Sequence, residues 1–353
     1  MKTAPPSPLK WLRRNFFADL PSTLTSLVLG SVVLVLLAHA FEWAVLHAVF
    51  RPDVELCRAL DHGGACWGMI AEKYRIILFG RYPYEAQWRP LLATLLLLSL
   101  LGLSSLPTCW KRWLPPLWLV GLTAILALMK GGMGGLETVD TDLWGGLPLT
   151  LLLTIAGIGG AFPLAVLIAL GRHSSLRVIR TLLAWYVELV RGMPLIPVLF
   201  LASFLFPLLL PKGITFDVLV RVLAAIMLFA AAYLSEAIRG GIESIPAGQQ
   251  EAGLALGLTS WQALRLIVLP QALRAVVPSV MNSAIGLFKE TSLVTVIGLF
   301  DLTGALSLAL AGDAQWRPFH LEGYLFIGAL YWVGCFGLSR YSLWIERRLR
   351  TPA

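Results

Sequence analysis

The chain has 353 residues, of which 58% are hydrophobic and only 14% are charged. Soluble globular domains are about a quarter charged, so this composition excludes an ordinary soluble domain and indicates an integral membrane protein. The formal net charge of +8 does not indicate a nucleic-acid partner, because the basic residues lie between apolar runs and form no stripe interleaved with aromatic residues.

Apolar runs long enough for membrane-spanning helices occur along the whole chain. A spanning helix needs about 20 largely apolar residues, because the hydrocarbon offers no water to the backbone. We therefore predict an all-α, polytopic integral membrane protein with about eight transmembrane helices. The two shortest runs are expected to pair around the basic turn at Lys111 and Arg112. The predicted spans are residues 22–49, 91–106, 114–129, 144–170, 182–210, 218–237, 276–300 and 324–344.

An even number of spans places both termini on one side of the membrane. Basic residues cluster near both ends, so the positive-inside rule makes this side cytoplasmic. The loop 51–89 is then periplasmic, although its six basic residues conflict with the same rule. We expect no signal-peptide cleavage after Ala40, because the apolar run begins only near Leu24, behind a basic head, and continues to Phe50. The basic residues near the ends are Lys2, Lys10, Arg13, Arg14, Arg347, Arg348 and Arg350.

The four cysteines are too few for a disulfide-rich scaffold. No Cys or His cluster has zinc-like spacing, so we expect no metal site. Cys57 and Cys66 lie in one polar loop, and they are candidates for a disulfide if that loop faces the oxidising periplasm.

Two regions are expected. Residues 1–139 form an N-terminal region with about three spans and the long loop 51–89, and residues 140–353 form a unit of five spans. The glycine-rich turn 131–135 separates them as a flexible linker. No G-x-x-x-x-G-K-S/T sequence occurs in the chain, so we expect no ATPase activity of its own.

Between the sixth and seventh predicted spans, residues 238–270 are too polar to cross the membrane. Pro246 is a typical first residue of a helix, and Gly257 is expected to end or turn that helix. Two short helices that meet at a glycine form a rigid projection that a cytoplasmic partner can hold. The alternative is a hairpin that lies on the membrane surface without a partner.

The second helix of this segment has its own start and stop signals. Thr259 or Ser260 is a good N-cap, and the helix is expected to run to Leu269. Pro270 is expected to break it, because proline lacks the N–H that an interior helical residue donates.

The same segment carries a recognisable pattern, in which Glu-Ala-Gly at 251–253 is followed by a glycine, an isoleucine and Leu-Pro at the spacing of the EAA loop. The chain thus resembles the permeases of ATP-binding-cassette (ABC) importers. Gly253 departs from the usual alanine, which is expected to loosen the first helix by up to about 1 kcal/mol. The resemblance implies that the ATPase-coupling residues are Glu251, Ala252, Gly253, Gly257, Ile267, Leu269 and Pro270.

Two further blocks narrow the resemblance. Residues 186–195, YVELVRGMPL, are similar to the Y-x-E-x-x-R-G-x-P-L block of polar amino-acid permeases of the histidine, glutamine and glutamate type. Residues 289–293, KETSL, are similar to their K-D/E-T-S-L block. The N-terminal region resembles the M subunit of general L-amino-acid importers of Gram-negative bacteria. These permeases often have a glutamine soon after the first block, but this chain has Pro197 and Val198 there. The resemblance therefore implies no substrate-binding role at these positions.

The resemblance implies a five-helix, type I (MetI-like) permease core and transport of L-amino acids across the bacterial inner membrane. The implied partners are an ABC ATPase dimer, a second homologous permease in a heterodimer, a periplasmic amino-acid-binding protein and membrane lipid. Hydrolysis falls to the ATPase, which uses ATP and magnesium. This chain is then not an enzyme and binds no cofactor.

Charged residues at membrane depth are candidates for the transport pathway. Glu188 and Arg191 share a helix face and could pair, either as an interfacial salt bridge or in contact with substrate. Lys289 and Glu290 interrupt an apolar run, and facing lipid would cost several kcal/mol each. They must face a cavity or a partner, as pathway residues or as a bridge between subunits. The candidates are Glu188, Arg191, Lys289, Glu290, Thr291 and Ser292.

Two other functional classes fit less well. A secondary transporter driven by an ion gradient could use Lys289 and Glu290 as a relay, but such folds commonly contain two similar halves, which the three-plus-five arrangement lacks. A membrane enzyme is disfavoured because we find no metal cluster, nucleophile elbow or carboxylate pair with acid–base spacing.

Overall fold

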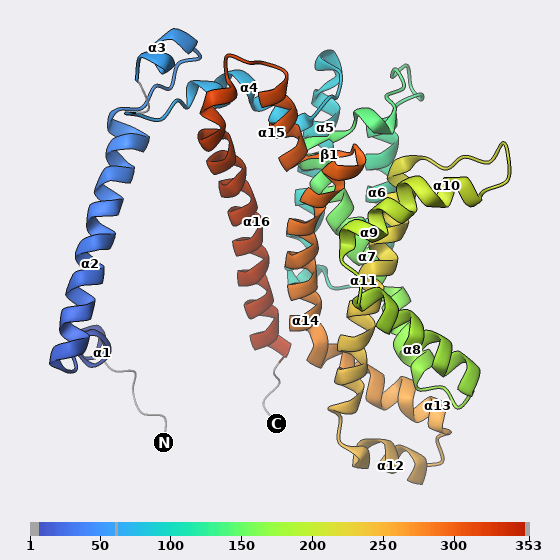
Figure 1. The fold of residues 1–353 in the computed structure, drawn as a ribbon. Helices are drawn as coiled ribbons and strands as arrows, with labels where there is room; N and C mark the ends of the chain where they lie inside the picture. The colour runs from blue at the N-terminus through green and yellow to red at the C-terminus, as the bar shows by residue number, and fades with distance from the viewer. Residues whose placement is uncertain (1–6, 61–62, 350–353) are drawn as a thin grey trace. The chain divides into compact units, whose positions relative to one another are not determined.

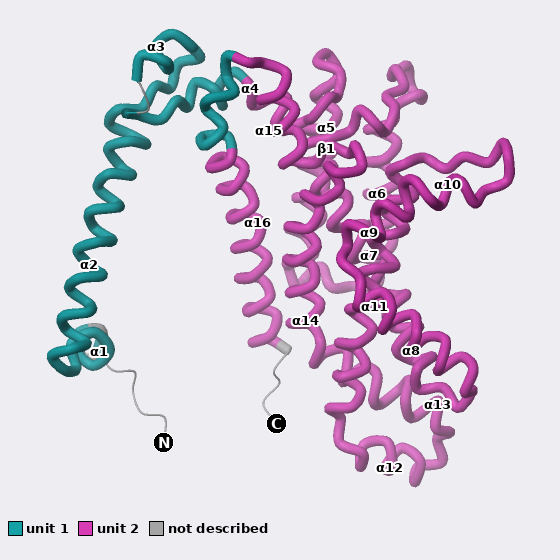
Figure 2. The backbone as a smooth tube through the Cα atoms, in the orientation of Figure 1, with its two compact units in different colours: residues 1–72, 315–323 teal, residues 73–314, 324–353 magenta. Residues whose placement is uncertain are grey.

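The computed structural model describes residues 7–60 and 63–349, and these residues are mostly helical (Figure 1). The strand among them is the two-residue β1, Phe300–Asp301. The chain divides into two compact units (Figure 2): unit 1 comprises residues 1–72 and 315–323, and unit 2 comprises residues 73–314 and 324–353. The all-α membrane fold is confirmed, whereas the domain boundary at residue 139 stays a prediction.

The helices follow one another with short connections. The α-helices are α1 Pro8–Phe16, α2 Leu20–Phe41, α3 Val54–Ala59, α4 Gly68–Phe79, α5 Trp88–Ser105, α6 Leu114–Lys130, α7 Gly146–Arg172, α8 Arg177–Arg191, α9 Leu195–Phe200, α10 Phe206–Leu209, α11 Val218–Glu243, α12 Ala247–Ala255, α13 Ser260–Ala263, α14 Leu269–Glu290, α15 Leu302–Ala311 and α16 His320–Leu349. The π-helical segments are η1 Glu42–Leu46, η5 Leu201–Leu205 and η6 Leu264–Val268. The 3-10 segments are η2 Tyr84–Ala86, η3 Pro107–Cys109, η4 Thr141–Leu143, η7 Thr291–Ile297 and η8 Arg317–Phe319.

Unit 1 contains an apolar helix and a crosslinked loop. Asp19 caps α2 by accepting a hydrogen bond from the backbone N–H of Ser22 at 2.8 Å. None of the residues of α2 is buried against the described chain, as is typical of a helix that faces lipid. Cys57 and Cys66 form a disulfide with their Cα atoms 5.5 Å apart. The Cys66 N–H also donates to the buried carboxylate of Glu322 at 2.8 Å.

The disulfide gives a simple prediction for thiol labelling. Cys109 and Cys335 are free thiols, so we expect denatured, unreduced protein to react with two equivalents of a thiol reagent. After reduction, all four cysteines of the sequence should react. Mass spectrometry of the labelled protein measures both numbers. Four reactive thiols before reduction would show that the loop is not crosslinked in the cell.

The core of unit 2 is formed by α7, α11 and α14. A Cβ atom on Gly157 of α7 would lie 2.9 Å from both Ile226 of α11 and Leu287 of α14, so any larger residue there would force these side chains to shift. Small residues allow membrane helices to approach closely. Further along α7, alanines recur at every fourth position and are fully buried: Ala161, Ala165 and Ala169. The core thereby fixes α11 and α14 side by side.

Six helices of the described chain are long and apolar enough to cross a membrane, and α8 with α9–α10 adds a seventh only if this bent pair is one span. The apolar helix α6 is shorter, with 17 residues. The expected span 182–210 is not one straight helix, because α8 ends at Arg191 and the segment Leu195–Leu209 leaves it at 109°. Pro194 explains the break, since proline disfavours a helical conformation in the residue before it.

Asp301 is fully buried at the start of α15, among groups from three elements. Its Oδ1 atom accepts hydrogen bonds from the Gly304 N–H and the Thr295 hydroxyl, both at 3.0 Å. Its Oδ2 atom accepts one from the Tyr331 hydroxyl at 2.7 Å. Burial outweighs these bonds and raises the pKa of Asp301 above its ordinary value.

The raised pKa of Asp301 predicts how an Asp301→Asn variant responds to pH. A carboxyl whose pKa rises on folding favours the folded state while protonated, and this contribution is lost as the pH rises through the folded-state pKa. Asparagine keeps an oxygen for the cap but has no charge to bury. We expect its melting temperature, relative to wild type, to rise between acidic and mildly alkaline pH. Thermal unfolding in detergent measures this, and a difference independent of pH would contradict it.

Candidate pocket and coupling loop

The chain leaves α11 at Glu243 and forms two short helices before α14. The first, α12, begins directly after Pro246. Gly257 then adopts φ +85°, in the left-handed region that favours glycine. Thr259 caps α13 and exchanges two hydrogen bonds with Gln262 in a capping box. A turn at Gly257 between two helices is therefore confirmed, and in Figure 1 α12 and α13 lie together beyond the ends of α11 and α14.

Gly253 is buried where α12 lies against the following helix. A Cβ atom at this position would lie 2.8 Å from Cδ1 of Ile267 and 3.2 Å from Cβ of Ala263. The glycine thus allows close packing between the two short helices. Glycine has a low helix propensity, which was expected to loosen α12. At this position it also allows the close packing of α12 against the following helix.

Pro270 does not break the second helix, contrary to the expectation from the sequence. Residues 260–290 are helical without interruption, and the turn directly before the proline, η6, is π-helical. A proline removes one N–H donor and crowds the preceding turn, and the wider π turn accommodates both effects. The side-chain amide of Gln271 also donates, through Nε2, to the Ile267 carbonyl at 2.9 Å. The second helix of the coupling loop, which comprises residues 238–270, therefore continues from Ser260 into α14.

The predicted coupling residues fall into an exposed set and a packed set. The exposed residues are available to a partner: Glu251, Ala252, Gly257 and Pro270. Gly253 and Ile267 pack the two helices against each other, whereas Leu269 is half-buried against the core of α7, α11 and α14. Their role in ATPase coupling stays a prediction.

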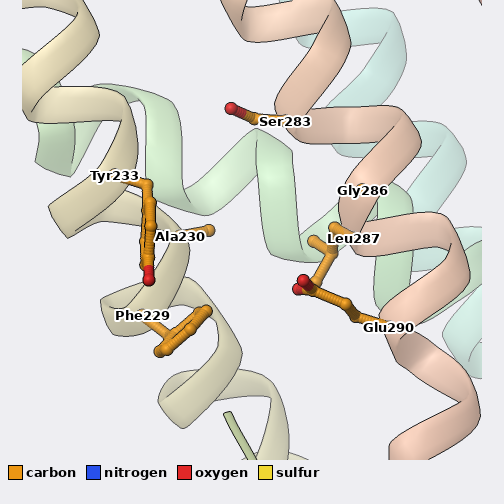
Figure 3. Close-up of a pocket in the computed structure, with 7 residues that line it drawn as sticks. All are labelled: Phe229, Ala230, Tyr233, Ser283, Gly286, Leu287 and Glu290. Atoms are coloured by element: carbon orange, nitrogen blue, oxygen red, sulfur yellow. The ribbon is translucent and has the colours of Figure 1, made fainter. Parts of the chain in front are cut away.

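A pocket of about 170 Å³ lies between α11 and α14. Figure 3 shows that one wall comes from α11 and the other from α14, with the Glu290 side chain extending toward α11. Glu290 is the one charged side chain among the seven that line the pocket. The lining residues are Phe229, Ala230, Tyr233, Ser283, Gly286, Leu287 and Glu290.

The other residues of the KETSL block do not line this pocket. Lys289 is exposed on α14. The Thr291 side chain is fully buried and donates to the Phe288 carbonyl at 2.8 Å. The Ser292 hydroxyl donates to the Lys289 carbonyl at 2.8 Å. These two hydroxyls therefore satisfy carbonyls where α14 ends and the 3-10 helix η7 begins, and of the block only Glu290 reaches the pocket.

Within the described part of the chain, Glu188 and Arg191 form no ion pair with each other. Arg191 instead places its guanidinium 5.6 Å from the ring centre of Tyr233 and 3.9 Å from a carboxylate oxygen of Glu236. Sequence reasoning missed both Tyr233 and Glu236. A signal was present for Glu236, because an acidic residue inside an apolar run, with Arg239 three positions later, is a typical functional candidate.

No group of three or more His, Cys, Asp or Glu side chains in residues 7–60 and 63–349 is placed to hold a metal ion. The arrangement that remains is a pocket between two helices, a carboxylate that enters it, and a loop with exposed residues that connects the same two helices. Such an arrangement can bind a small solute and respond to a partner at the loop.

Comparisons with known proteins give the family. Residues 161–351 match the family described as "Binding-protein-dependent transport system inner membrane component". The chain is 39% identical over 351 residues to the inner membrane amino-acid ABC transporter permease protein YhdY of Escherichia coli (strain K12), covering 97% of this chain and 93% of that protein. It is 35% identical over 408 residues to the glutamate/glutamine/aspartate/asparagine transport system permease protein BztC of Rhodobacter capsulatus, covering 97% and 94%.

A solved structure supports the same assignment. The crystal structure of an amino acid ABC transporter with histidines superposes with a TM-score of 0.52 at 31% identity, over 57% of this chain and 92% of that one. These relatives are transport permeases rather than enzymes. The chain therefore belongs to the family of binding-protein-dependent transport system inner membrane components, as a multi-pass inner-membrane permease of an ABC importer that works with an ATPase and a binding protein.

Proposed function

We propose that the chain is one of two related, non-identical permease subunits of an importer that carries L-amino acids into the bacterial cytoplasm. A periplasmic amino-acid-binding protein delivers the substrate, and a separate ATPase dimer, with ATP and magnesium, docks on the exposed residues of the coupling loop. The permease itself binds no cofactor. Amino acids are supported as cargo by the names of relatives that align with 97% of the chain.

The observation that carries the mechanism is the connection between loop and pocket. The coupling loop joins α11 to α14, and these are the same two helices that line the pocket. Because residues 260–290 are one uninterrupted helix, a movement imposed on α12 and α13 is transmitted along α14 to Glu290. Alternating access by rigid-body movement requires such a stiff connection.

The proposed orientation places the coupling loop and both termini in the cytoplasm. Arg13 and Arg14 in α1 and Arg347 and Arg348 in α16 support it through the positive-inside rule. The disulfide between Cys57 and Cys66 supports a periplasmic position for the loop 51–89, since disulfides persist in oxidising compartments. Two further basic residues near the termini, Lys2 and Arg350, lie outside the described residues.

We order the proposed pathway residues by their position relative to the pocket. Glu290 enters the pocket and is the first candidate for contact with the ammonium group of a substrate. Arg191 contacts a residue of the pocket wall, Tyr233, whereas Glu188 is exposed. Lys289, also exposed, suits a bridge to the second permease, and Thr291 and Ser292 shape the end of α14.

Reconstitution into proteoliposomes tests the proposal. The permease pair, the ATPase and the binding protein should together take up labelled amino acids only when ATP is present on the side of the coupling loop. Competition by each unlabelled amino acid then defines the cargo. Uptake driven by an ion gradient without the ATPase, or ATP hydrolysis by this chain alone, would contradict the assignment.

A further inference from the structure

Glu236 of α11 accepts hydrogen bonds from two arginines on different helices. Arg172, at the end of α7, donates to Oε2 at 2.5 Å, and Arg239, one turn along α11, donates to Oε1 at 2.5 Å. A third arginine, Arg191 at the end of α8, has Nη1 3.9 Å from Oε2. We name these four residues, Glu236, Arg172, Arg191 and Arg239, the arginine node.

The arginines of the node do more than neutralise the charge of Glu236. The side chains of Glu236 and Arg172 are only 23% and 15% exposed, and charges this far from water need partners. One arginine would suffice for that purpose. Instead, arginines from α7, α8 and α11 converge on Glu236, so the carboxylate ties the ends of three helices together.

The node also lies between the pocket and the coupling loop. On the pocket side, the Arg191 guanidinium lies 5.6 Å from the ring centre of Tyr233, whose hydroxyl donates to the Arg191 carbonyl at 3.3 Å. Tyr233 itself lines the pocket, as Figure 3 shows. On the loop side, Arg239 pairs with Glu243, the last residue of α11 before the coupling helices. The contacts are continuous from the pocket wall to the loop.

We propose that Glu236 is a positioning residue for coupling between the pocket and the ATPase. It holds Arg191 against Tyr233 and fixes the end of α11 that leads into the coupling loop, so that the state of the pocket controls stimulation of ATP hydrolysis. Packed interfaces of this kind adopt discrete arrangements rather than deforming continuously, and the node favours one of them. This inference rests on the proposed function.

The test is a Glu236→Gln variant in the complete importer, reconstituted with its second permease, ATPase and binding protein. Glutamine keeps the size of the side chain but removes the charge that attracts three arginines. We expect basal ATPase activity to be retained and stimulation by the amino-acid-loaded binding protein to fall about tenfold, within the usual range of coupling between sites. The number of ATP molecules hydrolysed per amino acid imported should rise.

A matched control and a second variant make the result specific. Asp313→Asn removes a carboxylate of similar exposure, 31%, that pairs with Lys73 rather than with the node, and should leave stimulation unchanged. Arg191→Met leaves the two shorter contacts of Glu236 in place and should also lower stimulation, which keeps the test valid if Glu236→Gln fails to assemble. Combining the two variants should add little, because both remove the same interaction.

The outcomes separate this inference from the proposed function. Wild-type stimulation in both Glu236→Gln and Arg191→Met would overturn the positioning role of Glu236 while leaving the importer assignment intact. Fully multiplicative effects in the double variant would show that the two residues act independently, which also overturns it. Absence of amino-acid stimulation in the wild-type complex would instead contradict the proposed function.

Discussion

Replacing Gly253 with leucine should strongly lower ATP-driven uptake while the permease still inserts into the membrane. Even a Cβ atom at this position would lie 2.8 Å from Ile267 and 3.2 Å from Ala263, so a leucine must push α12 away from the following helix. Overpacking of this kind costs about 1–3 kcal/mol. We expect uptake by the reconstituted importer to fall about tenfold to a hundredfold, since each 1.4 kcal/mol corresponds to about a factor of ten.

Gly248 provides the matched control for this experiment. It lies in the same helix, but a Cβ atom there meets nothing within 4 Å, so Gly248→Leu should keep the packing of the loop. A Gly253→Ala variant should fall between wild type and leucine, because the tip of the Ile267 side chain can move aside. Normal uptake by Gly253→Leu would contradict the packing argument, and equal loss at Gly248 would assign the effect to the outer surface of the loop.

Replacing Glu290 with glutamine should lower uptake by about tenfold in an importer that assembles normally. Glu290 is the one charged residue that lines the pocket, and every amino acid presents an ammonium group at neutral pH. Hydrogen bonds to charged groups contribute about 1.5–3 kcal/mol, and a neutral amide forfeits much of this. Initial uptake rates at saturating binding protein, with the ATPase rate measured in parallel, give the size of the loss.

Lys289→Met is the companion variant for Glu290→Gln. Lys289 and Glu290 are both exposed, but only Glu290 lines the pocket, so the loss of Lys289 should affect assembly with the second permease more than the uptake rate per assembled complex. Size-exclusion chromatography of the complex separates the two effects. Normal assembly and wild-type uptake in Glu290→Gln would remove Glu290 from the transport pathway.

The coupling loop shows where sequence reasoning is strong and where it fails. A helix start at Pro246, a turn at Gly257 and a cap at Thr259 or Ser260 were all predicted, because each depends on residues within four positions of itself. The break expected at Pro270 was wrong. The expectation that a proline breaks a helix assumes that the turn before it is an ordinary α-helical turn. Here that turn is π-helical.

The candidate pathway shows a different failure. Glu188 and Arg191 are three positions apart, which favours a pair on one helix face. Arg191 instead lies beside Tyr233 and Glu236, which belong to another helix, α11. Spacing along a helix shows which side chains are neighbours on that helix, but it contains no information about the helix that packs against it.

By itself, the sequence determined the class of the protein, its approximate spans and where the helices of the coupling loop begin, because hydropathy, caps and turns are local properties. Only the tertiary structure decided that α11 and α14 form the pocket, that Glu290 enters it, and that Arg172 meets Glu236 across 64 positions of sequence. These contacts depend on how closely α7, α11 and α14 approach one another. That approach is set by small residues such as Gly157 acting together with their distant neighbours, so no single segment of sequence contains it.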